Sequence, residues 1–359
     1  MQPDKVEPKF QSIYDWVPVQ DENKYEITAV LPEGITQDNI SVKLNKESGN
    51  IIATIKEQLP FLSGKVFGPI SDISYHYVDK TIHFIFKKAT KDNWPLPFKG
   101  PINKKTPLDP QSCLLTFIIN ASQGVDSTDL LLHSVSAMFP PAVLSFANLC
   151  QQTGQNLTDS IVLLKAMVDD YKVPQAATLL GHFGLFEMGL TQEEGIDYMK
   201  YAADHGEELA KITLGYVYSP YEEPHGPWEN VDLAVDYYNQ VKDNPRSQYG
   251  LGLIEYYKGN KELGRSMVRK ARVDLPNMPD IKEDDEKPST LQSGELKAPE
   301  NQAEEVISVE PTTLQTDQVK CQTEQKGVST GIKAGAAVMA GIAVAGFAAL
   351  AFSFIKRRK

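Results

Sequence analysis

One segment of the chain comes close to a motif that binds phosphate groups. The residues from Gly259 to Ser266 nearly spell a nucleotide-binding phosphate loop, with Arg265 at the position where such loops carry lysine. A phosphate loop follows a β-strand, whereas this segment follows a predicted helical stretch around Tyr249 to Tyr257. It therefore fits a turn between two helices, and we predict that it binds no nucleotide.

The histidines and cysteines show no spacing that is typical of a metal site. His76 and His83 fall on neighbouring predicted strands, where an exposed or hydrogen-bonded histidine is favoured over a metal ligand. The other histidines form no helical pair and have no cysteine at ligand spacing; they are His133, His182, His205 and His225. Cys113, Cys150 and Cys321 lie far apart, which predicts reduced thiols rather than a disulfide framework.

Motifs of catalysis are also missing from the sequence. It contains no nucleophile elbow, no zinc-peptidase helix and no dinucleotide fingerprint. A formal net charge of -11 argues against nucleic acid as a partner, and 359 residues of which 41% are hydrophobic suffice for two or three domains. We predict a multidomain protein that is not an enzyme and has no catalytic residue, cofactor or metal.

The C-terminus has the composition of a membrane anchor. An unbroken apolar run extends from Ala334 to Ile355 and is followed by four cations, Lys356, Arg357, Arg358 and Lys359. As a helix this run would be about 33 Å long, enough to cross the hydrocarbon core of a bilayer. We predict a transmembrane helix within 331–359 and favour it over a buried core helix, which is seldom free of charge over this length.

Small residues recur every fourth position along this run. They are Ala337, Gly341, Ala345 and Ala349, and such a stripe lets two helices pack closely in a membrane. The stripe predicts a weak homodimer contact through the anchor. An alanine-rich composition explains it equally well.

The position of the apolar run predicts the orientation of the chain. The N-terminus has no basic region and no apolar core, so we expect no signal peptide, and residues 1 to about 330 are placed in the cytosol. This arrangement resembles tail-anchored proteins. A mildly hydrophobic span with a basic tip favours a mitochondrial or mitochondrion-related outer membrane, with the endoplasmic reticulum as the alternative.

The stretch before the anchor reads as an acidic linker. Residues 274–330 are rich in Glu, Asp, Gln, Pro, Ser and Thr, and their apolar content is too low to offset chain entropy. We predict a disordered tether. Its charge run from Glu283 to Glu286 is most simply a solvated spacer, and a bait for a basic partner is the alternative.

Residues 12–98 read as a β-sheet domain, after an N-terminal tail of residues 1–11. Apolar residues alternate with polar neighbours in four segments, as in Ile82, Phe84 and Phe86; the others begin at Tyr25, Ile40 and Ile51. Turn signals lie at Pro32 to Gly34, at Lys46 to Asn50 and at Ser63-Gly64. We predict an all-β antiparallel sandwich followed by a connector over 99–125.

Several motifs in this region together resemble a CS domain, the sandwich of chaperone-associated co-chaperones and nuclear-distribution proteins. They are Tyr14-Asp15-Trp16, Tyr25 to Thr28 ending in Leu31-Pro32, Gly64 to Phe67, and Phe84 to Lys88 before Trp94. The resemblance implies binding of client proteins or of the ninety-kilodalton heat-shock chaperone, without catalysis. Trp94-Pro95 is similar to the family's tryptophan-proline step, but Leu96-Pro97 departs from the family's next residues. Trp94 either contacts a partner or, as we favour, closes the edge of the sandwich.

Residues 126–273 change to a helical period. Thr191 and Glu194 form a capping box, Ile196 and Met199 share one helical face with Ala203, and Gly206 ends the helix. Comparable units begin at Leu180-Gly181, Leu214-Gly215 and Leu251-Gly252, with a degenerate one near Phe146-Ala147. The intervals between these three units are 34 and 37 residues, and repeats of this length predict an all-α solenoid of stacked helix pairs.

This segment resembles the Sel-one-like branch of tetratricopeptide repeats, most closely in the phrase from Tyr198 to Gly206. The resemblance implies a concave surface that binds a peptide or a partner protein. Four repeat tyrosines are candidates for that groove, although packing between repeats is the favoured use of each: Tyr218, Tyr237, Tyr249 and Tyr256.

Two functions follow from these modules. The first is a membrane-tethered co-chaperone or chaperone adaptor, which binds a heat-shock chaperone or client through the sandwich and a second protein through the repeats. The alternative is an organelle-surface receptor or scaffold for cargo, import or tethering.

Overall fold

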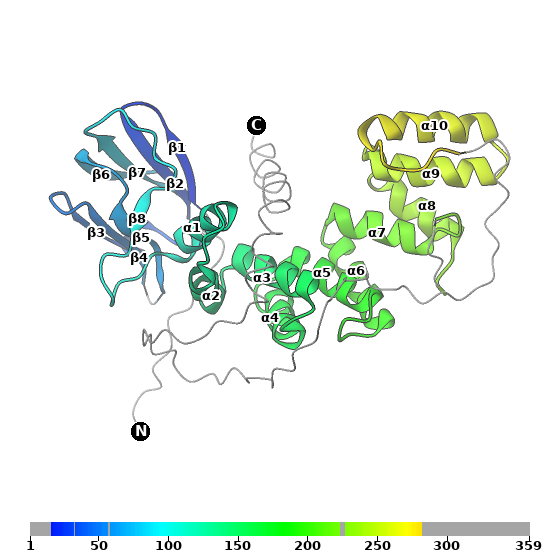
Figure 1. Ribbon diagram of the computed structural model, residues 1–359, viewed down its shortest axis with the longest axis horizontal. Coiled ribbons are helices and arrows are strands. Elements are labelled where there is room, and N and C mark those ends of the chain that lie inside the picture. Colours follow the sequence, from blue (N-terminus) through cyan, green and yellow to red (C-terminus); the bar gives the residue numbers. More distant parts are fainter. Residues whose placement is uncertain (1–15, 32, 57, 223–226, 282–359) are drawn as a thin grey trace, which may run out of the picture. The chain divides into compact units, whose positions relative to one another are not determined.

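The computed structural model describes residues 16–31, 33–56, 58–222 and 227–281. These residues belong to two compact units that divide after Val173, and Figure 1 labels the helices and strands of both. The predicted anchor, including Ala334, Gly341, Ala345, Ile355 and Lys356 to Lys359, lies outside the described residues, as does linker 282–330. None of the helices in the described part of the chain combines the length and the apolar character that a membrane crossing requires.

The first unit contains two four-stranded antiparallel sheets. The first sheet has the order β1 (Trp16–Gln20), β2 (Lys24–Val30), β7 (Thr81–Lys88), β6 (Ile70–Val78). The second has the order β3 (Ile40–Asn45), β4 (Asn50–Ile55), β5 (Pro60–Val66), β8 (Phe98–Gly100), and a short 3-10 turn, η1 (Gln37–Asn39), precedes β3. The sheets pack face to face through ring pairs such as Phe61 with Phe84 and Phe98 with Phe86, each 6.3 Å between centroids. The antiparallel β architecture predicted from alternation is confirmed.

The predicted alternation places the core residues correctly in the central strands. Ile27 on β2 pairs with Phe84 on β7, and both side chains are fully buried. Ile51, Ala53 and Ile55 on β4 are likewise buried. Because β3 is an edge strand, the corresponding side chains there remain half-buried.

One predicted turn is wrong. Ser63 and Gly64 lie inside β5, where they pair with Ile52 and Ile51 of β4. Gly64 is required for packing rather than for a turn, since a Cβ atom there would lie 2.5 Å from Cγ of Phe98. The turn predicted after Lys46 is present between β3 and β4, with Gly49 at a φ of 66°.

A helix in the predicted connector joins the sandwich. Helix α1 (Pro110–Ser122) begins after Asp109, whose buried carboxylate accepts hydrogen bonds from the indole of Trp16 and the backbone amides of Ser63 and Ser112. Gln111 also donates to the carbonyl of Trp16 and accepts from its amide, as a neighbouring strand would do. Burial raises the pKa of Asp109 to about 6, although these donors oppose the shift. The connector therefore fixes α1 to β1 and β5.

The described residues of the first unit also form α2 (Thr128–Ser136), α3 (Pro140–Thr153) and α4 (Leu157–Asp169). Those of the second unit form α5 (Pro174–Leu185), α6 (Gln192–Asp204), α7 (Glu208–Tyr218), α8 (Val231–Asn239), α9 (Pro245–Tyr257) and α10 (Lys261–Asp274). The helices expected as one solenoid are thus divided between the two units. The degenerate repeat near Phe146 corresponds to the α3–α4 pair of the first unit.

The second unit is a series of three packed helix pairs, α5 with α6, α7 with α8, and α9 with α10. Helix α6 begins at the predicted capping box, where the amide of Glu194 donates to Thr191 Oγ1 and the amide of Thr191 donates to Glu194 Oε2. Gly206, at a φ of 89°, follows its end. Both predicted boundary signals are confirmed.

The repeated glycines explain why the pairs pack closely. A Cβ atom on Gly181 would lie 2.5 Å from Met199, one on Gly215 would lie 2.6 Å from Tyr238, and one on Gly252 would lie 2.9 Å from Val268. In each pair the glycine of the first helix thus receives a side chain of the second helix. The predicted repeat of helix pairs is confirmed.

Candidate functional site

Trp94 is a core residue of the sandwich. Its side chain is 1% exposed and its ring stacks on Tyr25, 5.6 Å between centroids. Gly68 lies so close that a Cβ atom there would be 2.5 Å from Nε1 of the indole. A partner has no access to a ring in this position, so burial supports the structural use of Trp94.

A buried lysine beside Trp94 was not singled out from the sequence. The Nζ atom of Lys88 donates to Gln20 Oε1 at 2.9 Å, to the carbonyl of Asp21 at 2.8 Å and to the carbonyl of Asp92 at 2.9 Å. It also lies 5.5 Å from the centroid of the Trp94 ring. Lys88 therefore links the end of β7 to the turn that follows β1 and to the loop that follows β7.

Replacing Lys88 with methionine should lower the free energy of unfolding of the first unit by about 2 kcal/mol, because three partly buried hydrogen bonds of its ammonium group are lost. The adjacent Lys87 is exposed, so Lys87→Met should cost less than about 0.5 kcal/mol. Urea denaturation followed by hydrogen exchange of β2 and β7 measures both changes. Equal costs for the two variants would contradict this role.

The two strand histidines lie side by side on the outward face of the first sheet. His76 on β6 pairs with His83 on β7, and their rings stack at 4.9 Å. His83 Nδ1 lies 3.0 Å from Glu26 Oε1 and 3.1 Å from Thr28 Oγ1. The described residues contain no group of three His, Cys, Asp or Glu side chains that could hold a metal ion.

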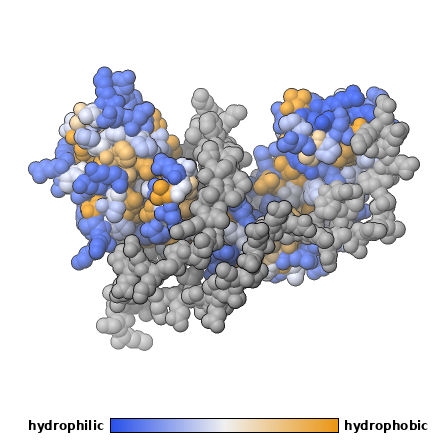
Figure 2. All heavy atoms as spheres, in the orientation of Figure 1, coloured by the Kyte–Doolittle hydropathy of each residue, from blue (hydrophilic) through white to orange (hydrophobic). Residues whose placement is uncertain are grey.

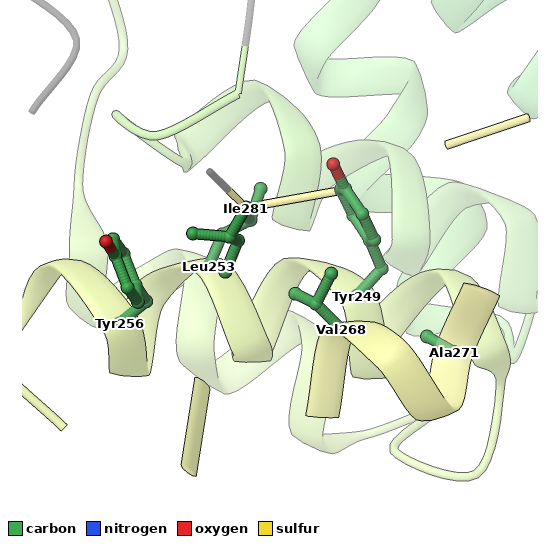
Figure 3. Close-up of a cluster of buried hydrophobic side chains, with 6 residues drawn as sticks. All are labelled: Tyr249, Leu253, Tyr256, Val268, Ala271 and Ile281. Atoms are coloured by element: carbon green, nitrogen blue, oxygen red, sulfur yellow. The ribbon is translucent and has the colours of Figure 1, made fainter. Parts of the chain in front are cut away.

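Three of the four tyrosines predicted as groove candidates are buried. Tyr249 and Tyr256 belong to a hydrophobic cluster between α9 and α10 (Figure 3), and Tyr218 is 6% exposed. Tyr237 is half-buried and stacks on Tyr218 with 5.8 Å between ring centroids. Burial supports packing between helices as the use of these rings.

A buried charged cluster in the second unit was not predicted. Glu222 accepts a hydrogen bond of 2.5 Å from the hydroxyl of Tyr238 and forms an ion pair of 2.5 Å with Arg246. The guanidinium of Arg246 lies 5.4 Å from the ring centroid of Tyr216 and 5.5 Å from that of Tyr249. Burial and the charge of Glu222 raise the pKa of Tyr238, so its hydroxyl stays protonated and donates. The cluster fastens the loop after α7 to α8 and α9.

The first helix of each pair presents one partly exposed face. The packing glycines give the three first helices a common numbering, which we call the glycine register. Six positions before that glycine stand Gln175 on α5, Leu209 on α7 and Arg246 on α9. Residues four and seven positions further along lie on the same side of each helix. We call this surface the first-helix face; its members with exposed area are Gln175, Leu179, His182, Leu209, Thr213, Tyr216 and Arg246.

Leu209 is the most open apolar residue of the first-helix face, at 49% exposure. Apolar, aromatic and cationic groups are combined there, as in protein-binding surfaces. On the side of the molecule that Figure 2 shows, hydrophobic residues lie in small groups among hydrophilic ones in both units. The first-helix face is therefore distinguished by its repetition on successive helices rather than by size.

His182 gives this face a pH dependence. Desolvation lowers its pKa from 6.5 to about 4, so the neutral form is favoured in the folded state. The contribution of neutral His182 to the stability of the second unit is complete above the unfolded pKa of 6.5, and it is lost as the pH falls toward the folded pKa of about 4.

Between pH 7 and pH 5 the second unit should lose about 1 to 2 kcal/mol more in the wild type than in the His182→Leu variant. Leucine suits the position, since Leu253 is its equivalent on α9. The exposed His205 provides the control variant, His205→Leu. Hydrogen exchange of α5 and α6 at both pH values measures the loss, and an equal loss in the wild type and His182→Leu would contradict the assignment.

The segment that nearly spells a phosphate loop begins in the turn between α9 and α10 and continues into the start of α10. The amide of Gly264 donates to the carbonyl of Asn260 at 2.9 Å, as part of α10. A Cβ atom on Gly264 would lie 2.6 Å from the carbonyl oxygen of Gly252. The prediction of a turn within a repeat is confirmed.

Comparison with known proteins finds similarity in solved structures alone. No protein family matches the chain, and no curated protein sequence matches it. A Sel1 repeat protein from Oxalobacter formigenes is 21% identical, with a TM-score of 0.38 over 48% of this chain and 76% of its own. A protective antigen from uropathogenic Escherichia coli, c5321, which displays an SLR fold, is 17% identical with a TM-score of 0.38 over 46% of this chain and 38% of its own.

A third solved structure is similar to a smaller part of the chain. A nuclear movement protein from E. cuniculi GB-M1 is 12% identical with a TM-score of 0.20, over 23% of this chain and 96% of its own. All three scores are too low to carry an argument. The class of the second unit, a repeat of stacked helix pairs, rests on its helix and glycine packing.

Proposed function

We propose that this protein is a non-catalytic scaffold that binds a partner protein on the first-helix face of its helical repeats. The observation that carries this proposal is that partly exposed side chains on α5, α7 and α9 stand at the same positions relative to the packing glycine of each helix. Helix pairs stacked in this way form extended binding surfaces in repeat proteins. The resemblance of Tyr198 to Gly206 to Sel-one-like repeats supports the same function.

The sandwich serves as a second binding module, of the CS type, for a heat-shock chaperone or its clients. This part of the proposal is supported by the sequence motifs that resemble the CS family. Since Tyr25, Phe84 and Trp94 of these motifs are buried, contact would come from the outward strand faces.

The apolar run from Ala334 to Ile355 tethers both modules to a membrane, with a mitochondrial-type outer membrane favoured over the endoplasmic reticulum. The sequence alone supports this part. Tethering raises the effective concentration of the modules near that surface without new contacts. Imaging the chain with and without residues 331–359 tests it, and membrane retention of the truncated form would contradict the anchor.

Affinity capture with the full chain tests the binding function. Leu209→Glu places a charge on the first-helix face, and Leu263→Glu, at an exposed leucine of α10, is the matched control. We expect Leu209→Glu to capture at least about tenfold less partner than the wild type, and Leu263→Glu to capture as much as the wild type. Retention by both variants would contradict the first-helix face, and failure to recover a heat-shock chaperone with or without ATP would contradict the chaperone role.

A further inference from the structure

The chain turns back after α10 and lies against the last helix pair. Residues 275–281, which we call the strap, appear in Figure 1 as the orange coil that runs beside α9 and α10. Arg272 Nε donates to the carbonyl of Met278 at 2.8 Å, and Arg272 Nη1 forms an ion pair of 2.7 Å with Asp280. The hydroxyl of Tyr249 donates to the carbonyl of Pro279 at 3.2 Å. The strap is thus held through two backbone carbonyls and one carboxylate.

An aliphatic side chain fixes the end of the strap. Ile281 is 8% exposed and packs in the cluster of Tyr249, Leu253 and Tyr256. Figure 3 shows Ile281 above Leu253, between the rings of the two tyrosines. We call the receiving surface the strap groove; it consists of Tyr249, Leu253, Tyr256, Val268, Ala271 and Arg272.

These contacts define a general way of recognising an extended peptide. The hydroxyl of Tyr249 and the guanidinium of Arg272 donate hydrogen bonds to main-chain carbonyls, which a peptide of any sequence supplies. The ion pair selects an acidic residue, and the apolar cluster selects an aliphatic residue directly after it. The groove surface therefore specifies a short linear motif with an acidic and then an aliphatic residue.

The strap is held in a way that permits exchange. Its ion pair is partly exposed, with 29% of the Arg272 side chain and 46% of the Asp280 side chain accessible, and such pairs contribute little to stability. Ile281 is the strap residue that is buried in the cluster, with Met278 packed beside it. Much of the occupancy of the groove by the strap therefore comes from the covalent attachment of the strap to α10, which gives the strap a high local concentration.

We propose that the strap groove is a second binding site for a linear segment of a partner protein, with the acidic-aliphatic chemistry of Asp280-Ile281, and that the strap occupies this site in cis. The inference rests on the proposed function of the repeats as a protein-binding scaffold. It adds a site between α9 and α10 that adjoins the α9 part of the first-helix face at Leu253, and it names the class of ligand. A partner segment binds by displacing the strap.

The test uses the full chain in detergent and a fluorescein-labelled peptide with the sequence of residues 275–281. The variant Asp280→Arg with Ile281→Glu releases the strap without altering the groove, and Asp274→Arg, at an exposed aspartate of α10, is the matched control. We expect the released variant to bind the peptide at least about tenfold more tightly than the wild type or the control, because the intramolecular competitor is gone. Adding Arg272→Ala should weaken that binding by about tenfold or more.

Hydrogen exchange of α9 and α10 checks that the released variant is folded, and the milder Asp280→Ala replaces it if exchange shows that α10 has opened. Peptide binding that does not improve on release, or that survives Arg272→Ala, would overturn the inference and leave the strap as a terminal cap. This failure is separable from failure of the proposed function. Partner capture that depends on Leu209 would stand even if the peptide did not bind.

Discussion

Replacing Tyr238 with alanine should lower the free energy of unfolding of the second unit by about 4 kcal/mol, the cost of emptying a large aromatic site. The side chain is fully buried and is wedged between two glycines, since a Cβ atom on Gly215 or Gly250 would lie 2.6 Å or 2.4 Å from its ring. Its loss also leaves the buried carboxylate of Glu222 without its hydroxyl donor. Hydrogen exchange of α7, α8 and α9 in urea measures the change.

The neighbouring Tyr237 gives the control. It is half-buried, so Tyr237→Ala should cost about 1 kcal/mol or less. Tyr238→Phe keeps the ring and removes the hydroxyl, so it should cost about 1 to 3 kcal/mol. Similar losses for Tyr237→Ala and Tyr238→Ala would show that the glycine-lined site does not hold the helix pairs together.

The Asp109→Ala variant should destabilise the first unit by about 3 to 5 kcal/mol, because it leaves buried donors without an acceptor. The indole of Trp16 and the amides of Ser63 and Ser112 all lose their partner, and α1 loses its N-terminal cap. Urea denaturation followed by hydrogen exchange of β1, β5 and α1 measures the loss. The exposed Asp170 supplies the control Asp170→Ala, and a loss no larger than that of the control would contradict the role of Asp109.

The strands could be predicted because alternation records which side chain faces a core. This succeeded for β2, β4 and β7, whose inward residues are buried. It failed at Ser63-Gly64, because a glycine that admits an aromatic ring from another strand has the same sequence signal as a glycine in a turn. The ring belongs to Phe98, 34 residues later, so no local pattern could separate the two uses.

The helical repeat could be predicted because the same small residue recurs where each pair packs. The division of the helices after Val173 could not, since helix pairs look alike in sequence whichever unit they join. Helix α1 was also missed within the connector. Its attachment depends on Asp109 reaching Trp16 and Ser63, which are distant in the chain.

The candidate site was the least predictable part. Residue type indicated that the repeat tyrosines matter, but exposure separates a groove residue from a packing residue, and three of the four are buried. Glu222 and Arg246 are 24 residues apart and meet only in the folded unit. The CS-type function, the chaperone partner and the membrane anchor remain predictions from the sequence.

Site-specific photo-cross-linking in cells tests the central claim, that the first-helix face binds a partner protein. A photoreactive amino acid is placed at Leu209 on the first-helix face, and at Leu263 on α10 as the control, both about half exposed. Our account predicts a discrete cross-linked protein from position 209 that is absent from position 263. Equal cross-linking from both positions, or none from position 209, would contradict it.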